Sequence, residues 1–85
     1  MSTRRPIRDG DIEIRSLRAF VAVAEELSFT RAAERLSIAQ QAVSREIRRL
    51  EDLLGTRLFV RTTRLVTLTT DGERLLLRPP RHVAS

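Results

Sequence analysis

Residues 28–55 read SFTRAAERLSIAQQAVSREIRRLEDLLG, and the spacing of apolar side chains in this stretch decides the fold. The clearest periodic signal is a set of four residues that recur at intervals of four, three and four: Val43, Ile47, Leu50 and Leu54. This spacing places all four on one face of a helix, which we predict over residues 40–54. Gly55 follows at the position where a left-handed C-terminal cap belongs.

A shorter helix is predicted immediately before it, over residues 29–36. Ser28 can cap this helix, because its hydroxyl can accept a hydrogen bond from a backbone N–H group at the helix start. The inner side of the helix consists of small and apolar residues: Ala32, Ala33 and Leu36. Two adjacent alanines leave little side-chain bulk, so another helix can approach closely. Residues 37–39 then interrupt the pattern and predict a tight turn between the two helices.

The flanking sequence predicts another helix and a hairpin. A helix over residues 13–26 follows from an apolar stripe at three- and four-residue steps. The stripe consists of six residues: Ile14, Leu17, Phe20, Val21, Ala24 and Leu27. Residues 58–60 and 65–68 are short β-prone runs, and the polar residues 62–64 between them indicate a hairpin.

A short fourth helix is predicted after the hairpin. Thr70 and Glu73 are spaced as a capping box, and Asp71 suits the first turn of a helix. The helix must stop at Pro79-Pro80, because proline lacks the N–H donor and its ring clashes with the preceding turn. The order of these elements predicts a mainly α fold, a winged helix-turn-helix with three helices plus a two-stranded wing, followed by the short fourth helix.

Three segments are expected along the chain. Residues 1–11 are polar and contain Pro6 and Gly10, which predicts a flexible arm. Residues 12–69 are expected to form the winged helix-turn-helix domain. Residues 70–85 are expected to hold the short fourth helix and a tail.

The composition excludes most classes of catalyst. The 85 residues include no cysteine and a single histidine, His82, which argues against disulfides, thiolate sites and histidine metal clusters. The sequence contains no nucleophile–base pair, phosphate loop or metal-ligand set, so we predict a protein that is not an enzyme and uses no cofactor or metal. No apolar run reaches the ~20 residues of a membrane span, and we expect a soluble, cytoplasmic protein.

The charge favours a polyanionic partner. Sixteen arginines face eleven acidic residues, which gives a net charge of +5, and no lysine is present. The arginine fork can bind phosphate or the guanine edge with two bonds at once, although GC-rich coding also explains the absence of lysine. The expected partner is therefore nucleic acid or an anionic membrane surface. The membrane alternative is the weaker one, because the apolar helix faces lack bulky aromatics and carry interspersed acids.

The polar face of helix 40–54 is the candidate for base recognition. In a helix-turn-helix the second helix enters the major groove, where its N-terminal residues reach the base edges. The residues opposite the apolar stripe are polar or basic: Gln40, Gln41, Ser44, Arg45 and Arg48. Glutamine can read adenine and arginine can read guanine, with Arg48 assigned to phosphate. An ordinary solvated face is the alternative, and Arg49 is expected to be solvated or paired with Glu46 or Asp52.

Further basic residues mark the hairpin and the start of the short helix. Arg57, Arg61 and Arg64 lie in a segment without acids, residues 53–70. They suit phosphate or minor-groove contact, or alternatively protect the hairpin edge by charge. The start of the short helix holds three residues suited to phosphate contact: Ser28, Thr30 and Arg31. The alternative for Ser28 is that it serves only as a helix cap. A basic arm for the minor groove is the weakest candidate: Arg4, Arg5 and Arg8.

The run LRAFVAVAEELSFTRAAERLSIAQQAVSREIRRLEDLLGTRLFVRTTRLVTLTTDGERLL resembles the N-terminal DNA-binding domain of LysR-type transcriptional regulators, with the resemblance covering residues 14–76. Three ordered motifs carry it: SFTRAAERL, AQ-x-AVSR-x-IRRLE-x-x-LG-x-RLF and RT-x-R-x-V-x-LT-x-x-G. The resemblance implies a bacterial, cytoplasmic regulator of transcription that binds specific double-stranded DNA, with an inverted-repeat promoter site as the expected target.

The resemblance also implies site residues. The base-facing positions of the family fall on Gln40, Gln41, Ala42, Ser44 and Arg45. Its wing contact falls on Arg64, with Arg61 and Thr62 nearby. Its phosphate contacts fall near Ser28, Thr30 and Arg31. These positions agree with the residue-based set apart from Ala42.

The sequence departs from the family pattern at three places. Gln41 stands where proline is common, and Ala39 stands where serine is common, so the helix that follows lacks that cap. The fourth helix corresponds to the start of the family's long linker helix, which pairs two domains, and here it meets Pro79-Pro80. Because this helix is so short, we expect the family's homodimer to be weakened, and the family's effector domain is absent from the sequence. The alternative function is a protein-interaction or dimerisation module that uses the apolar residues around Leu75–Leu77.

Overall fold

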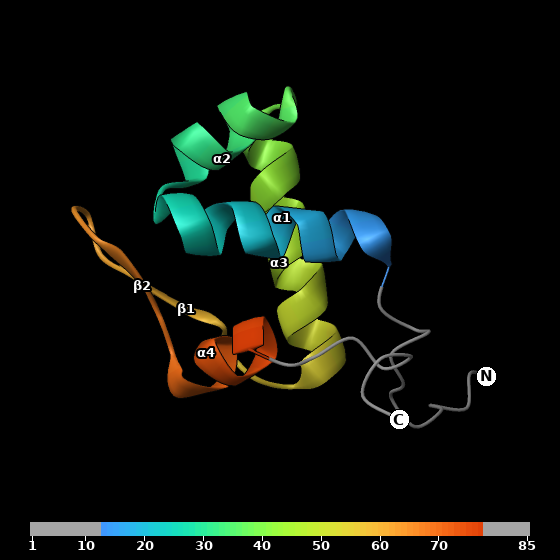
Figure 1. Cartoon of the computed structure of the whole chain (residues 1–85), viewed down its shortest axis with the longest axis vertical. Coiled ribbons are helices and arrows are strands. Elements are labelled where there is room, and N and C mark those ends of the chain that lie inside the picture. The colour runs from blue at the N-terminus through green and yellow to red at the C-terminus, as the bar shows by residue number, and fades with distance from the viewer. Residues whose placement is uncertain (1–12, 78–85) are drawn as a thin grey trace.

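The computed structural model describes residues 13–77 as four helices and a two-stranded antiparallel sheet (Figure 1). The helices and strands follow in this order: α1 (Ile14–Glu26), α2 (Phe29–Leu36), α3 (Gln40–Leu54), β1 (Phe59–Arg61), β2 (Val66–Leu68) and α4 (Thr70–Leu77). The mainly α winged helix-turn-helix is confirmed, as are the predicted bounds of α2 and α3, whereas α1 begins one residue later than predicted, at Ile14. Three predicted features lie outside the described residues: the arm over residues 1–11, Pro79-Pro80 and the tail with His82.

The core lies where α1, α2 and α3 pack on one another and on the first strand of the hairpin. Its fully buried large side chains come from three of these elements and from the segment before β1: Phe20, Val23, Val43, Ile47, Leu50, Leu58 and Phe59. The rings of Phe20 and Phe59 lie 5.5 Å apart, and Phe29 meets Phe59 edge-on at 6.1 Å. The aromatic contacts therefore join helices and wing in one core.

The buried side of α1 differs from the predicted stripe. Ile14 and Leu27 are 69% and 49% exposed, so both assignments are wrong. Ile14 stands in the first turn, and Leu27 is the left-handed cap residue with φ 51°, which takes it out of the helical phase. The side chains that are buried include several small ones: Ser16, Ala19, Phe20, Ala22, Val23 and Ala24. Because α1 packs on both α2 and α3, its buried surface is wider than a single stripe.

The turn between α2 and α3 is as tight as predicted. Ser37 adopts φ 58°, and the N–H of Ile38 donates to the carbonyl of Ala33 at 3.0 Å, which closes the end of α2. Ala32 and Ala33 are buried, so α2 lies close to its neighbours. Ala39 begins α3 without a side-chain cap, as the sequence predicts.

The hairpin pairs Phe59 with Leu68, Val60 with Thr67 and Arg61 with Val66. Its strands begin one residue later than the predicted runs, and β1 extends to Arg61. The hydroxyl of Thr62 accepts from the backbone N–H groups of Arg64 and Leu65, at 3.3 and 3.0 Å, and so shapes the loop between the strands.

The start of α4 corrects the predicted capping box. Thr69, not Thr70, is the cap: its hydroxyl accepts from the N–H of Gly72 at 2.9 Å and donates to the carbonyl of Arg57 at 2.7 Å. The reason is spatial, because only Thr69 follows β2 directly and faces the segment before β1. Gly72 is buried there, and a Cβ atom at this position would overlap the carbonyl oxygen of Leu58. None of the helices in the described part of the chain is long and apolar enough to cross a membrane.

Candidate nucleic-acid interface

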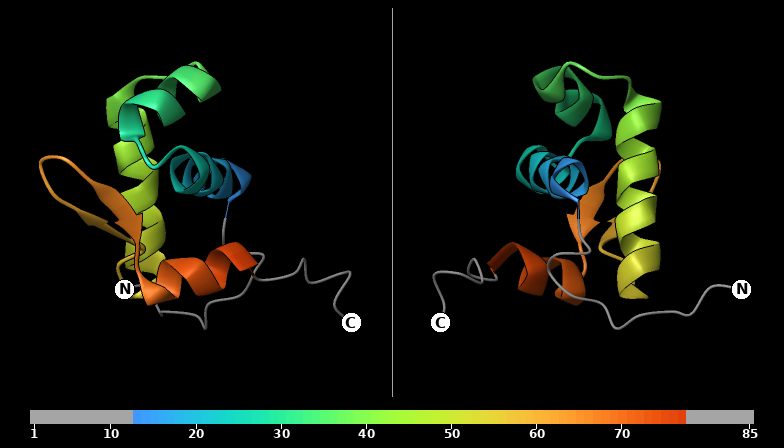
Figure 2. Two further views of the ribbon diagram at one scale, coloured as in Figure 1. Left: turned by 60° about the vertical axis from the view of Figure 1, so that its left-hand side comes forward. Right: turned by 90° about the vertical axis from the view of Figure 1, so that its right-hand side faces the viewer.

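One long side of α3 faces outward because its apolar side is buried. In the right-hand view of Figure 2, α1 and α2 lie together on one side of α3, and the other side is open. The buried residues Val43, Ile47 and Leu50 fix this orientation. An open depression of ≈ 780 Å³ follows the outward side and is bordered by seven residues: Gln40, Gln41, Ser44, Arg45, Arg48, Arg49 and Asp52.

The predicted base-facing residues are gathered at the start of α3. Gln40, Gln41 and Arg45 are exposed, whereas Ala42 and Ser44 are half-buried. The hydroxyl of Thr30 donates to Oε1 of Gln40 at 3.4 Å, so the starts of α2 and α3 are adjacent. The structure therefore brings two predicted sets of contacts, those on α2 and those on α3, onto neighbouring surface.

The three arginines of this side have different surroundings. Within residues 13–77, Arg45 and Arg48 have no acidic group within 4.0 Å. Arg49 is bonded to Glu13, with 3.1 Å between Nη2 and Oε2. The expected pairing of Arg49 with Glu46 or Asp52 is therefore wrong, although its side chain is exposed to solvent as the other alternative had it. A contact between residues 36 positions apart leaves no local pattern in the sequence.

At the start of α2, Ser28 acts as a helix cap. Its hydroxyl accepts from the N–H of Arg31 at 3.1 Å, which confirms the predicted cap. Thr30 and the Arg31 side chain are exposed beside it. Farther along α2, Arg35 binds Glu25 at 2.7 Å and Glu26 at 3.4 Å. The hydrogen bond to Glu25 raises the pKa of Arg35. The two ion pairs join α2 to the end of α1.

The wing arginines are not equivalent. The guanidinium carbon of Arg61 lies 4.4 Å from the ring centroid of Phe29, a cation–π contact that sequence reasoning missed. Arg61 alternates with Val60 along β1, so it lies on the same side as the buried Phe59 and faces α2. Arg64 stands exposed in the loop between the strands.

The hairpin begins next to the end of α3. Glu51 accepts from the N–H of Leu58 at 2.8 Å and lies 3.9 Å from Nε of Arg57. Sequence reasoning missed this role for Glu51, because only the fold brings its carboxylate to the hairpin. A second open depression lies here, bordered by residues of α3 and the hairpin: Arg48, Glu51, Asp52, Gly55, Thr56, Arg57 and Arg61. No group of three or more potential metal ligands occurs among the described residues.

Three packed helices, with a tight turn between α2 and α3, followed by a two-stranded hairpin form a winged helix-turn-helix domain. The model of the family described as "Bacterial regulatory helix-turn-helix protein, lysR family" matches residues 14–73. This chain belongs to that family.

Relatives and solved structures agree with this assignment. The HTH-type transcriptional regulator PgrR of Escherichia coli K12 is 62% identical over 64 residues, which are 75% of this chain and 21% of that protein. BudR of Klebsiella aerogenes is 56% identical over 62 residues, 73% of this chain and 43% of that protein. The chain thus spans about a fifth of the length of PgrR and less than half that of BudR.

Two solved structures are DNA complexes of DNA-binding domains. The BenM domain on catB site 1 DNA is 51% identical with a TM-score of 0.71, over 74% of this chain and 71% of that one. The CbnR domain bound to DNA is 39% identical with a TM-score of 0.73, over 75% of this chain and 74% of that one.

Proposed function

We propose that residues 13–77 bind double-stranded DNA with sequence preference, with α3 in the major groove. One observation carries the proposal: α3 buries Val43, Ile47 and Leu50 in the core and presents a polar, basic set on the opposite, open side: Gln41, Arg45 and Arg48. An α-helix fits the major groove, and these side chains offer the donors and acceptors that base edges and phosphates require. The DNA complexes of the similar BenM and CbnR domains support it.

The proposal assigns a role to each predicted site residue. The base-facing residues are Gln40, Gln41, Ala42, Ser44 and Arg45. The phosphate contacts are Ser28, Thr30, Arg31 and Arg48. The wing contacts are Arg61, Thr62 and Arg64, on the backbone or in the minor groove. Thr62 acts through the shape of the loop, since its hydroxyl is engaged with loop N–H groups.

In the wider proposal the chain acts as a regulator of transcription in the bacterial cytoplasm and has no enzymatic activity. An inverted-repeat site fits a homodimer of the domain. The exposed leucines of α4, Leu76 and Leu77, support a role in pairing copies, as does exposed Ile14. In this proposal the pairing of two copies accompanies DNA binding. Pairing alone would give no role to the polar and basic residues on the open side of α3.

The test is the affinity for DNA measured in rising salt. Sites selected from a random pool are compared with scrambled duplexes, by gel shift and by fluorescence anisotropy. We expect a preference for the selected site together with a steep logarithmic salt slope. Binding to neither duplex at low salt would contradict the proposal and favour the interaction module. Equal binding to both duplexes would contradict the sequence preference alone.

A further inference from the structure

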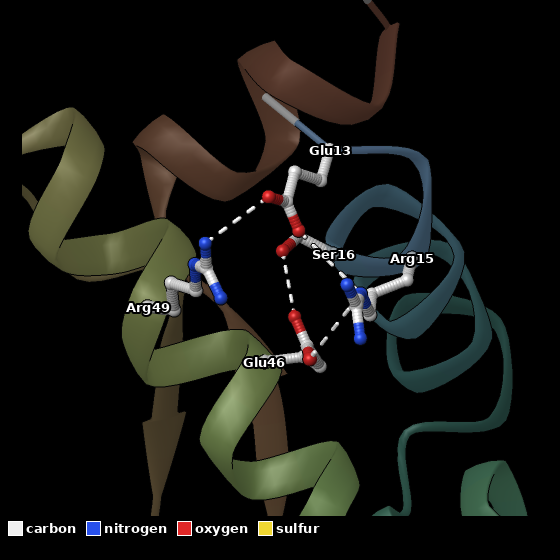
Figure 3. Close-up of polar contacts among 5 residues, drawn as sticks. All are labelled: Glu13, Arg15, Ser16, Glu46 and Arg49. Carbon is white, nitrogen blue, oxygen red and sulfur yellow. Dashed lines mark hydrogen bonds and ion pairs between the residues drawn. The ribbon is translucent and has the colours of Figure 1, made fainter. Parts of the chain in front are cut away.

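A chain of alternating charges lies between the start of α1 and one edge of α3 (Figure 3). The carboxylate of Glu13 binds Arg49 at 3.1 Å through Oε2 and Arg15 at 3.4 Å through Oε1. Nε of Arg15 also lies 4.0 Å from Oε2 of Glu46. We call Glu13, Arg15, Ser16, Glu46 and Arg49 the charge cluster. Its two acids and two arginines balance, so this edge of α3 carries no net charge.

The charge cluster is anchored in the interface between α1 and α3. Ser16 is only 3% exposed and donates to Oε1 of Glu46 at 2.8 Å. The Glu46 side chain is itself 13% exposed, so the inner end of the cluster is fixed. Charges that form a connected network hold their geometry better than an isolated surface pair. Glu13 at the start of α1 is therefore well placed to hold the Arg49 side chain.

Arg49 nevertheless belongs to the side of α3 that we propose binds DNA. It follows Arg45 by four residues, about one helical turn, and both border the same open depression. Its neighbour Arg48 borders that depression too, but no acid of the described chain lies within 4.0 Å of it. Of these two adjacent arginines, Arg49 is therefore already paired with an acid, whereas Arg48 is not paired with any acid of the described chain.

We propose that Glu13 is a positioning residue that holds Arg49 away from the phosphate backbone. The inference rests on the proposed function. Each arginine that neutralises a phosphate strengthens binding to every sequence alike and contributes about 0.9 to the logarithmic salt slope. Because the ion pair with Glu13 engages the guanidinium of Arg49, one arginine–phosphate contact is lost. This loss limits the sequence-independent part of the affinity for DNA. Arg48, by contrast, is available to a phosphate.

The first experiment removes the acid without changing its shape. Glu13→Gln should raise affinity for a random-sequence duplex roughly two- to fivefold at low salt. It should also steepen the salt slope by about 0.9. Glu25→Gln is the matched control: it changes the net charge equally, but its partner Arg35 lies on α2. We expect this control to leave the slope unchanged.

The second experiment compares the adjacent arginines. Arg48→Ala should flatten the slope by about 0.9, whereas Arg49→Ala should leave it unchanged. Glu13→Gln in the Arg49→Ala background should gain nothing. Circular dichroism melting of each variant checks that the fold is intact, and Glu13 and Arg49 are both exposed enough for substitution.

Three results would overturn the inference while leaving the proposed function standing. One is identical slopes for Glu13→Gln and Glu25→Gln. Another is a gain that persists in the Arg49→Ala background, since charge alone would then explain it. The third is equal flattening by the two arginine variants. Failure of the wild-type domain to bind any duplex would overturn the proposed function itself, and the inference with it.

Discussion

At the scale of single residues, Arg61 links the proposed DNA-binding surface to the core through its contact with Phe29. Its guanidinium covers Phe29, whose ring meets Phe59 in the core. A cation held over an aromatic face loses less freedom when a phosphate binds it than a free side chain does. Arg64 has no such support in the described structure, so the two wing arginines should respond differently to substitution.

The first prediction concerns base recognition by Arg45. Arg45→Ala should weaken binding to the selected site by about 1–3 kcal/mol and relax the preference at one base position. The reason is its exposed place near the start of α3, opposite the buried stripe. Repeating the site selection with the variant measures both effects. Unchanged affinities for selected and scrambled duplexes would show that Arg45 does not read a base.

The second prediction separates the two wing arginines. Arg64→Ala and Arg61→Ala should each weaken binding to many sequences and flatten the salt slope by about 0.9. Only Arg61→Ala should also destabilise the fold, by about 0.5–1 kcal/mol, because it loses the contact with Phe29. Urea unfolding without DNA measures this difference. Equal stability of both variants would mean that the cation–π contact contributes nothing measurable.

At the scale of elements, α3 has two tasks on opposite sides. Its inner side is buried in the core and its outer side is exposed to solvent. A charged residue introduced on the inner side should therefore lower the stability of the fold far more than one introduced on the outer side.

The third prediction uses that difference. Val43→Asp or Ile47→Asp should unfold the domain, because an unpaired buried charge costs several kcal/mol against a total stability of only ~5–15 kcal/mol. Gln41→Asp is the control on the exposed side and should leave the fold intact. Circular dichroism spectra and melting curves distinguish the variants. A helical, cooperatively melting Val43→Asp protein would mean that α3 is turned the other way.

The fourth prediction concerns the start of α4. Thr69→Ala should cost about 1 kcal/mol of unfolding free energy, because the hydroxyl caps the N–H of Gly72. Thr70→Ala, one residue along and exposed, should cost much less. Chemical denaturation of both variants supplies the comparison. The reverse order would restore the capping box that the sequence suggested.

Most of the fold was predictable because periodicity and caps are local. Val43, Ile47 and Leu50 are spaced by the helix itself, and the residues opposite them follow directly. The start of α4 was misassigned because two threonines stand side by side, and only the packing selects Thr69. Contacts between distant segments, such as Arg49 with Glu13, have no local signature. The sequence therefore indicated which residues are displayed, but not which of them are already engaged.

At the scale of the whole molecule, one aromatic cluster holds the parts together. Phe20 comes from α1, Phe29 from α2 and Phe59 from the wing, and each is almost fully buried. The wing has no second core in the described structure. Val60 and Leu65 are exposed, and the half-buried Val66 and Leu68 pack against the same core.

The fifth prediction follows from this shared core. Phe59→Ala should cost about 3–5 kcal/mol, and wing and helices should unfold in a single transition. The chain has no tryptophan or tyrosine, so circular dichroism and amide hydrogen exchange are the suitable probes. Early loss of protection in β1 and β2 alone, with helices still protected, would show that the wing unfolds separately.

The close fit at Gly72 has a mechanical consequence. Gly72 in the first turn of α4 lies against the carbonyl of Leu58. The Thr69 hydroxyl donates to the carbonyl of Arg57 and accepts from the N–H of Gly72. Thr56 donates to Asp71 at 2.6 Å. These contacts tie the first turn of α4 to the segment before β1, so we expect the joint between α4 and the wing to resist bending. A pull or twist applied to α4 would then be passed on to the wing and to the helices that share its core. Two domains coupled through α4 would change the distance and angle between their recognition helices while each domain kept its internal shape.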